Sequence, residues 1–101
     1  MRKLNEVVNR KWGYYSVLNE GAGDRCRWKL KRLIINPNSK SSLQRHFKRS
    51  ETWFYPQSNT DTFIAQGEWH QLINVSNEPL EIIEFQFGEE CLEEDIERKE
   101  E

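Results

Sequence analysis

The sequence has few of the residues on which small extracellular or zinc-stabilised proteins depend. Its 101 residues include two cysteines, Cys26 and Cys91, and two histidines, His46 and His70. Two cysteines lack the number and pattern of a disulfide framework or a zinc ribbon. We therefore expect both thiols to be reduced, as is typical of cytoplasmic proteins.

Long hydrophobic runs are also missing, and apolar residues make up only 36% of the chain. No stretch approaches the length of a membrane span, and residues 1–6 lack the apolar run of a signal peptide. The net charge of -2 gives no overall bias towards nucleic acid. We expect a cytoplasmic protein with no membrane partner and no nucleic-acid partner.

Aromatic residues are plentiful, with four Trp, five Phe and three Tyr to fill a modest core. The length suggests a single domain over residues 1–101, with an N-terminal arm at 1–9 and an acidic tail at 89–101. About seven short strand-like segments, such as Leu80–Phe87, alternate with turns. This pattern predicts an all-β antiparallel sandwich or barrel. Leu92 and Ile96, four residues apart, predict a short C-terminal helical turn or helix.

Charge is distributed unevenly along the chain. Residues 25–49 carry nine Lys or Arg and no Asp or Glu, whereas residues 78–101 carry eleven Asp or Glu and two Lys or Arg. A basic strand beside an acidic strand would satisfy both charges through cross-strand pairs. The other interpretation is that part of the basic face binds a phosphorylated ligand.

The two histidines lie in polar motifs within otherwise apolar, strand-like surroundings. Residues 44–53 read QRHFKRSETW, and His70 ends the segment GEWH at 67–70. If the fold brings these motifs together, they form a small polar site that could hold a metal ion. If it does not, each histidine is a hydrogen-bonded wall residue.

Several motifs occur in the order found in one known family. Residues 10–13 (RKWG) resemble its Arg-Pro-Trp-Gly opening, and residues 43–53 resemble its Leu-Gln-Met-His-His-His-Arg-Ser-Glu-His-Trp motif. Residues 67–70 with Asn74 resemble its second motif. From about residue 10 to residue 98, the chain thus resembles the cupin domain of type II mannose-6-phosphate isomerases. This domain also forms the C-terminal part of mannose-1-phosphate guanylyltransferases. The resemblance implies a small, jelly-roll-like antiparallel β-barrel.

Two departures from the family pattern affect the expected site and its edges. Cupins usually bind metal through His-x-His, a following Glu and a later His, and Lys48 stands in place of the second His. A protonated lysine has no free lone pair and cannot be a ligand. The family also has additional β-structure between its motifs, which residues 56–62 replace here. We expect a barrel trimmed by about one hairpin, its edge covered by homodimerisation or by residues 1–9.

The resemblance implies a divalent metal site made by Gln44, His46, Glu51 and His70, with Zn as the first candidate and Mn, Fe, Co or Ni as alternatives. Glu51 could instead form an ion pair with Arg49. Gln44, His46 and Lys48 would face the same side of an extended strand. Lys48 could then donate to a ligand phosphate or to Glu51, and in the second case a salt bridge would replace the metal.

The activity implied by the resemblance is the metal-dependent isomerisation of mannose 6-phosphate to fructose 6-phosphate. Arg45 and Lys48 would hold the phosphate or assist proton transfer, and Trp53 and Trp69 would be core walls or would stack on the sugar. The catalytic base is not identified. The alternative is a non-catalytic cupin with a degraded metal site, which binds a sugar or nucleotide-sugar or acts as an assembly module.

Overall fold

The structure, a computed structural model, describes residues 4–99 and contains strands but no helix within that range. It therefore contains no helix long and apolar enough to cross a membrane. The strands are β1 (Val7–Arg10), β2 (Gly13–Ala22), β3 (Arg27–Ile35), β4 (Ser39–Lys40), β5 (Leu43–Arg45), β6 (Arg49–Tyr55), β7 (Thr60–Ile64), β8 (Ile73–Asn74), β9 (Leu80–Gly88) and β10 (Glu97–Lys99). The predicted all-β class is confirmed.

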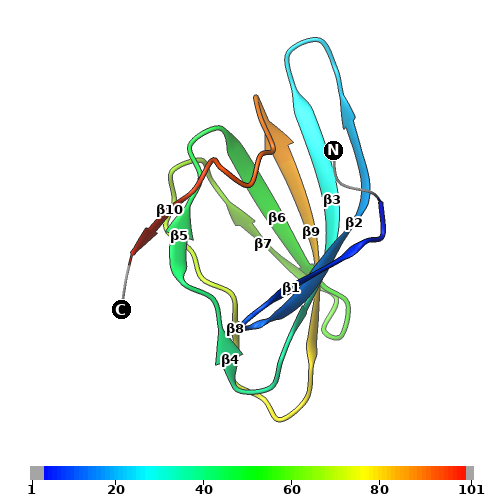
Figure 1. Cartoon of the computed structure of the whole chain (residues 1–101), viewed down its shortest axis with the longest axis vertical. Helices are drawn as coiled ribbons and strands as arrows, with labels where there is room; N and C mark the ends of the chain where they lie inside the picture. Colours follow the sequence, from blue (N-terminus) through cyan, green and yellow to red (C-terminus); the bar gives the residue numbers. More distant parts are fainter. Residues whose placement is uncertain (1–3, 100–101) are drawn as a thin grey trace.

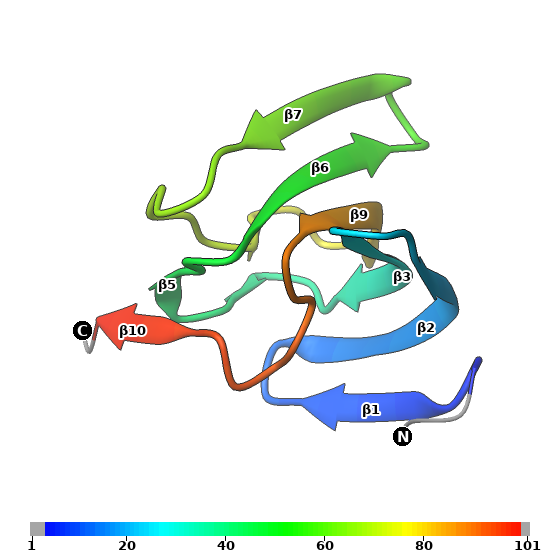
Figure 2. The same cartoon turned by 90° about the horizontal axis from the view of Figure 1, so that it is seen from above.

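Six strands form one antiparallel sheet in the order β1-β2-β3-β9-β6-β7. The sheet is strongly curved, and the short pairs β5-β10 and β4-β8 lie across its open side (Figures 1 and 2). This arrangement is an open, barrel-like fold with an interior between the main sheet and the two short pairs. The predicted antiparallel barrel is confirmed.

Strand alternation determines which side chains fill this interior. In β3 and β9, Leu33 pairs with Ile82, and both side chains are buried. They belong to a core cluster made of Tyr15, Leu33, Ile35, Trp53, Ile64, Leu72 and Ile82. Because β9 alternates, Glu84 and Gln86 lie on the same inward face as Ile82. The sheet thus carries polar groups into its own core.

Gly13 explains one of the family-like motifs at the start of the chain. A Cβ atom at this position would collide with the carbonyl oxygen of Ile34 on the neighbouring strand. The carbonyl of Trp12 accepts a hydrogen bond of 2.8 Å from the Asn36 N–H. This close approach fixes the turn that brings Arg10 and Lys11 to the mouth of the interior.

The two edge strands of the main sheet, β1 and β7, have different environments. β1, from the predicted N-terminal arm, pairs with β2 and is one edge of the sheet; residues 1–3 lie outside the described range. β7 is the opposite edge, and its Phe63 is 63% exposed. The arm therefore extends the sheet as an edge strand, while β7 has no further strand beside it within residues 4–99.

The acidic tail differs from the prediction. The expected C-terminal helix is absent, since the chain makes one turn, in which the Asp95 N–H donates to the Leu92 carbonyl at 3.2 Å, and then forms β10. β10 pairs with β5, with Glu97 opposite Arg45. A helix over residues 91–99 is excluded because the β10 contacts require an extended chain. The two cysteines are free thiols, as expected.

Candidate metal centre

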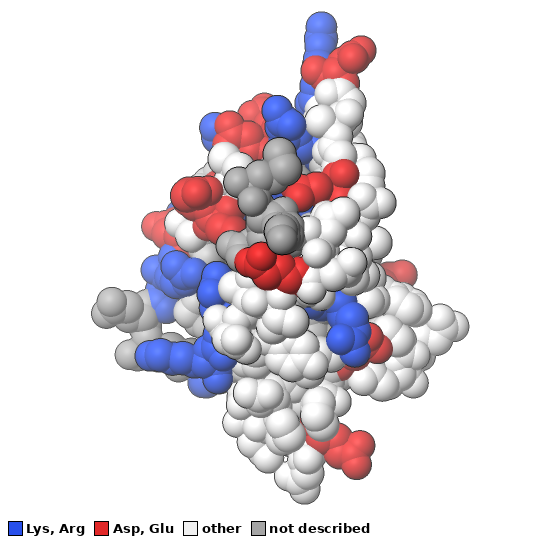
Figure 3. Space-filling view, turned by 45° about the vertical axis from the view of Figure 1, so that its right-hand side comes forward, with Lys and Arg blue, Asp and Glu red and all other residues white. Residues whose placement is uncertain are grey.

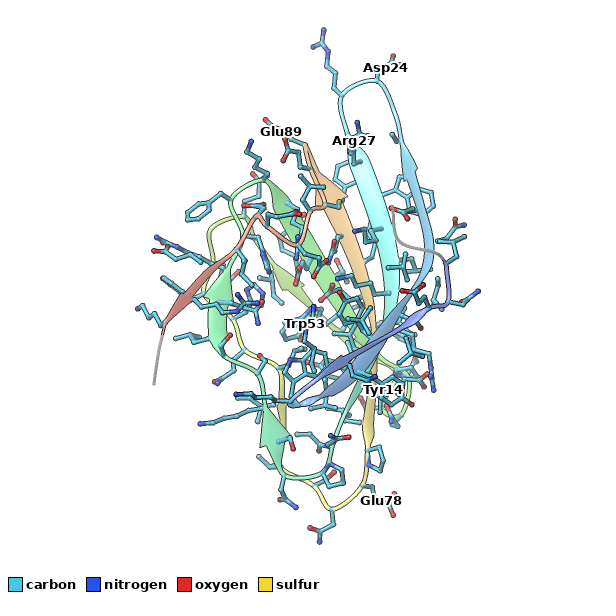
Figure 4. The ribbon with its side chains drawn as sticks, viewed as in Figure 1. Tyr14, Asp24, Arg27, Trp53, Glu78 and Glu89 are labelled. Carbon is cyan, nitrogen blue, oxygen red and sulfur yellow. The ribbon has the colours of Figure 1, made fainter. Side chains whose placement is uncertain are left out.

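The interior contains a polar cavity of about 520 Å³. Its floor includes His46, Glu51, His70 and Glu84, and its walls include the core residues Tyr15, Leu33, Trp53 and Leu72. Trp53, on β6, lies near the centre of the fold (Figure 4). Both predicted motifs therefore contribute to one cavity.

His46, Glu51 and His70 converge on this floor. The Nε2 atoms of His46 and His70 lie 3.4 Å and 3.5 Å from the two oxygens of Glu51. One potential ligand atom from each residue lies within 4.8 Å of the others. Two ligands bound tetrahedrally at about 2.1 Å from a zinc ion would be about 3.4 Å apart. This donor set fits a divalent cation.

Both histidines are held in the tautomer that a metal ligand needs. His46 Nδ1 lies 2.7 Å from the Asp95 carbonyl oxygen, and His70 Nδ1 lies 2.9 Å from the Glu68 carbonyl oxygen. A carbonyl oxygen can only accept, so each Nδ1 carries the proton and each Nε2 keeps its lone pair. Burial lowers the pKa of His46 to about 4 and also lowers the pKa of His70, which keeps both rings neutral near pH 7.

Arg49 is the cation already present on this floor. Its side chain is buried, and its Nε donates to Glu51 at 2.9 Å. One terminal nitrogen lies 3.2 Å from His46 Nε2, and the other donates to the Leu92 carbonyl at 2.9 Å. Burial opposes the charge of Arg49, but Glu51 and Glu84 raise its pKa above the ordinary value. The guanidinium therefore contacts two atoms that could coordinate a metal ion, Glu51 Oε2 and His46 Nε2.

Glu84 is a second buried carboxylate on the floor. The Trp53 indole N–H donates to it at 2.9 Å, and the Gln86 amide donates to its other oxygen at 2.6 Å. The same indole lies 3.2 Å from Glu51, so it connects the two carboxylates. Burial and the neighbouring Glu51 raise the pKa of Glu84 above its ordinary value.

The C-terminal segment closes one side of the cavity. Lys31, on β3, is buried and forms a 2.7 Å ion pair with Glu93. Burial opposes ionisation of Glu93, but Lys31 lowers its pKa to about 2. The carboxylate of Asp95 accepts hydrogen bonds from the backbone N–H groups of Phe47 and Lys48 at 3.0 Å and 2.9 Å. Within the described range, the predicted acidic tail is thus a structural wall of the site.

The predicted site residues fall into two groups. Gln44, His46, Glu51, Trp53 and His70 line the cavity. Gln44 donates from its amide to Ser41 Oγ at 3.4 Å and to the Ser42 carbonyl at 3.3 Å. Its backbone also pairs with that of His70, which joins the two motifs.

Arg45, Lys48 and Trp69 lie outside the cavity lining. Arg45 pairs with Glu97 and lies over the Trp69 ring at 4.5 Å. Lys48 is exposed and lies 3.5 Å from Glu90. The prediction that Lys48 faces the same side as Gln44 and His46 is wrong, because β5 ends at Arg45 and the chain bends before β6 begins. The internal cation expected at Lys48 is provided by Arg49.

Sequence reasoning missed Glu84, Gln86, Lys31 and Glu93, and placed Arg49 only as a strand-edge partner. A signal existed for the first two, since they alternate with Ile82 in the strongest strand pattern of the chain. Lys31 shares the inward face of β3 with Leu33, despite its charge. Glu93 gave no such signal, because its position depends on the path of the irregular tail.

Comparison with known proteins agrees with the motifs in the cavity. A family model described as the mannose-6-phosphate isomerase C-terminal domain matches residues 1–56 and 54–101. The chain belongs to this family. The match is divided at the connection between the two motifs, where the shortening was predicted.

The curated relatives are much longer than this chain. The alginate biosynthesis protein AlgA of Pseudomonas aeruginosa is 34% identical over 108 residues, which span 92% of this chain and 22% of AlgA. A mannose-1-phosphate guanylyltransferase of Salmonella muenchen is 33% identical over 113 residues, 97% of this chain and 23% of the relative. The chain thus spans about a fifth of the length of these relatives.

Solved structures support the cupin fold. A cupin-2 domain protein of Rhodospirillum rubrum, Rru_A2000, has a TM-score of 0.75 at 15% identity, over 100% of this chain and 80% of that one. The capsular polysaccharide assembling protein CapF of Staphylococcus aureus has a TM-score of 0.74 at 12% identity, over 95% and 34%. At these identities the likeness concerns the fold alone.

Proposed function

We propose that this cupin domain isomerises a phosphorylated hexose, mannose 6-phosphate to fructose 6-phosphate, in the cytoplasm and with a bound divalent metal. The main support is the convergence of His46, Glu51 and His70 on the floor of one cavity. Family membership adds the substrate class, because the matched family is named for this isomerase. The cavity volume of about 520 Å³ is in the range of small-molecule sites.

The metal would be held by His46, Glu51 and His70, with Gln44 as a possible fourth ligand. A divalent ion bound there would act as a Lewis acid towards the sugar oxygens. The two carbonyl acceptors on the Nδ1 atoms orient the histidine rings and keep the Nε2 lone pairs available. Zinc is the first candidate for this set, and Mn, Fe, Co and Ni use similar ligands.

Glu84 is the carboxylate best placed to move the proton. Aldose–ketose isomerisation transfers a proton between two neighbouring carbon atoms, and a base with a pKa raised towards neutrality serves this step best. Glu84 lines the cavity, and two N–H groups fix the orientation of its carboxyl group. We assign it as the base that the sequence did not identify, in place of Arg45 and Lys48.

Metal binding is the first test of this function. Protein stripped of metal and then freed of chelator should bind about one equivalent of Zn, Mn, Fe, Co or Ni and should melt at a higher temperature. His46→Ala and His70→Ala should abolish this shift, whereas Lys48→Ala should keep it. If the wild-type protein holds no stoichiometric metal and shows no shift, the metal-dependent isomerase is excluded.

Activity is the second test, made on metal-loaded protein with a coupled assay for fructose 6-phosphate. Glu84→Gln should retain metal and lose about 10²-fold or more in kcat. A wild-type rate in this variant would remove Glu84 from the mechanism and leave the metal site intact.

A second function is favoured by Arg49. Because Arg49 already donates to Glu51 and approaches His46, the floor is electrostatically satisfied without a metal ion. The domain would then bind a sugar or nucleotide-sugar without catalysis, or act as an assembly module. This alternative predicts ligand binding that chelators do not change, with no fructose 6-phosphate formed.

We also propose a homodimer. The outer face of the main sheet exposes Phe54, Phe63, Phe85 and Phe87, at 36% to 63% of their surface, next to the β7 edge. Pairing of such an edge and face would remove them from water. A dimeric mass in light scattering at micromolar protein is expected, and a monomeric mass would contradict it.

A further inference from the structure

The rim of the cavity differs from its floor in the charge that it presents. Arg10 and Lys11 come from the β1–β2 turn and Arg98 comes from β10, and all three are exposed residues that line the cavity. Arg98 is far from Arg10 and Lys11 in the sequence, yet all three line one cavity. Figure 3 shows blue Lys and Arg side chains gathered on the left of the face in view, with red Asp and Glu side chains above them.

These rim cations do not belong to the ion pairs of the fold. Within residues 4–99, ion pairs join Lys31, Arg32, Arg45, Lys48 and Arg49 to carboxylates, but none joins Arg10, Lys11 or Arg98 to one. Arg10 donates to the Asn9 carbonyl at 3.1 Å and lies over the Tyr15 ring at 5.4 Å. These contacts position its guanidinium without neutralising it. The rim therefore keeps positive charge for a ligand.

The cations of the floor are already paired. Arg49 donates to Glu51 and Lys31 pairs with Glu93, and Glu84 is a further acidic group in the same lining. A ligand with one anionic end would place that end at the rim and its uncharged end at the floor. The Ser41 and Gln44 side chains also line the cavity and bring polar atoms to its surface.

We propose that Arg10, Lys11 and Arg98 bind the phosphoryl group of the ligand and so fix which end of it reaches the floor. Arginine presents planar paired N–H donors that match phosphate oxygens, and lysine adds a mobile point charge. The ligand class is a polyhydroxylated molecule with a terminal phosphoryl group. This inference rests on the proposed function for the identity of the sugar only, since the rim would select the same anion in a non-catalytic domain.

The test is calorimetric titration of metal-free protein with mannose 6-phosphate, mannose and inorganic phosphate. Mannose 6-phosphate should bind at least about tenfold more tightly than mannose, because each charge-assisted contact is worth about a factor of ten. In Lys11→Gln/Arg98→Gln that preference should fall about tenfold or more, together with binding of inorganic phosphate. This double variant keeps Arg10 on the Tyr15 ring.

The matched control is Arg25→Gln/Arg27→Gln, which removes the same charge at the far end of the β2–β3 hairpin. Figure 4 shows Arg27 near that end, well away from Trp53. The control should retain the full preference for the phosphorylated sugar. Equal preference in the rim variant and the wild-type protein would overturn the inference.

The result separates this inference from the proposed function. If the rim variant loses phosphate binding but the wild-type protein forms no fructose 6-phosphate, the proposed phosphate site is supported and the proposed isomerase activity is contradicted. If the wild-type protein is active and the rim variant keeps the wild-type kcat/KM, the isomerase activity is supported and the proposed phosphate site is contradicted.

Discussion

The basic residues of the cavity floor and those of its rim differ in burial and in pairing. On the floor, Arg49 and Lys31 are buried and hydrogen-bonded to Glu51 and Glu93. At the rim, Arg10 and Arg98 are exposed and form no ion pair within residues 4–99. A buried charge without a partner reduces stability by several kcal/mol, because it has lost its hydration. An exposed charge keeps its hydration and is available to bind a ligand. Floor charges thus affect stability, and rim charges affect binding.

The largest effect expected from this comparison is at Arg49. Arg49→Met leaves Glu51 buried without its paired cation and removes one of the two cations that act on Glu84, and we expect a loss of about 3–5 kcal/mol in the free energy of unfolding. Urea unfolding of metal-free protein at pH 7 measures this. Added zinc should recover more stability in the variant than in the wild-type protein, because the metal replaces the missing charge.

Arg32→Met is the control for Arg49→Met. Its partner is Glu81, and its side chain is 42% exposed, so the loss should be below about 1 kcal/mol. Similar losses of unfolding free energy in Arg49→Met and Arg32→Met would contradict the claim that the buried ion pair stabilises the fold more than the exposed one.

Trp53→Phe should have the next largest effect, because it deletes the N–H that donates to Glu84 and Glu51 and keeps most of the ring. We expect a loss of about 1–3 kcal/mol in the same unfolding assay. Trp69→Phe removes an indole that lies outside the cavity lining and should cost less than about 1 kcal/mol. A larger loss at Trp69 would show that the polar floor is not the stabilising element.

A smaller, pH-dependent effect is expected at Glu93. Lys31 lowers the pKa of this carboxyl from an ordinary 4.5 to about 2, so its contribution is complete above about pH 4.5 and is lost as the pH falls towards 2. Glu93→Gln should therefore lower the melting temperature at pH 7 and lose its difference from the wild-type protein near pH 2. The side chain is 38% exposed, so screening limits the effect to about 1 kcal/mol.

Melting temperatures from pH 7 to pH 2 test this, with Glu94→Gln as the control. Glu94 is exposed and next in sequence, and Glu94→Gln should melt close to the wild-type protein at pH 7. A constant deficit in Glu93→Gln across this range would contradict the assignment.

The smallest effect is expected at Lys48, which sequence reasoning placed in the site. Its pair with Glu90 is exposed and 3.5 Å long, so Lys48→Ala should change the free energy of unfolding by less than about 0.5 kcal/mol. Metal-induced melting shifts should also match those of the wild-type protein. Loss of the metal-induced rise in melting temperature in this variant would show that Lys48 contributes to the metal site.

Much of this architecture could be predicted from the sequence because it depends on alternation. β9 was expected at Leu80–Phe87 and lies at Leu80–Gly88. The family motifs also indicated which distant histidines meet. In each case the signal was the type of side chain at a regular spacing.

The remaining parts of the site depend on groups that leave no such signal. The carbonyls of Leu92 and Asp95 hold Arg49 and His46, and every residue type has a carbonyl. The bend after Arg45, which turns Lys48 away, interrupts the period-two alternation on which its assignment depended. Sequence patterns could identify the donors on the floor, but not the backbone that orients them.

The carbonyl of Asp95 also sets a limit on when the site can form during synthesis. The ring orientation of His46 is completed by a residue 49 positions later, and β10 must pair with β5 to bring that residue into place. A nascent chain that ends before residue 95 lacks the acceptor that selects the Nε2 lone pair. The site is therefore complete only after nearly all of the described chain has been synthesised.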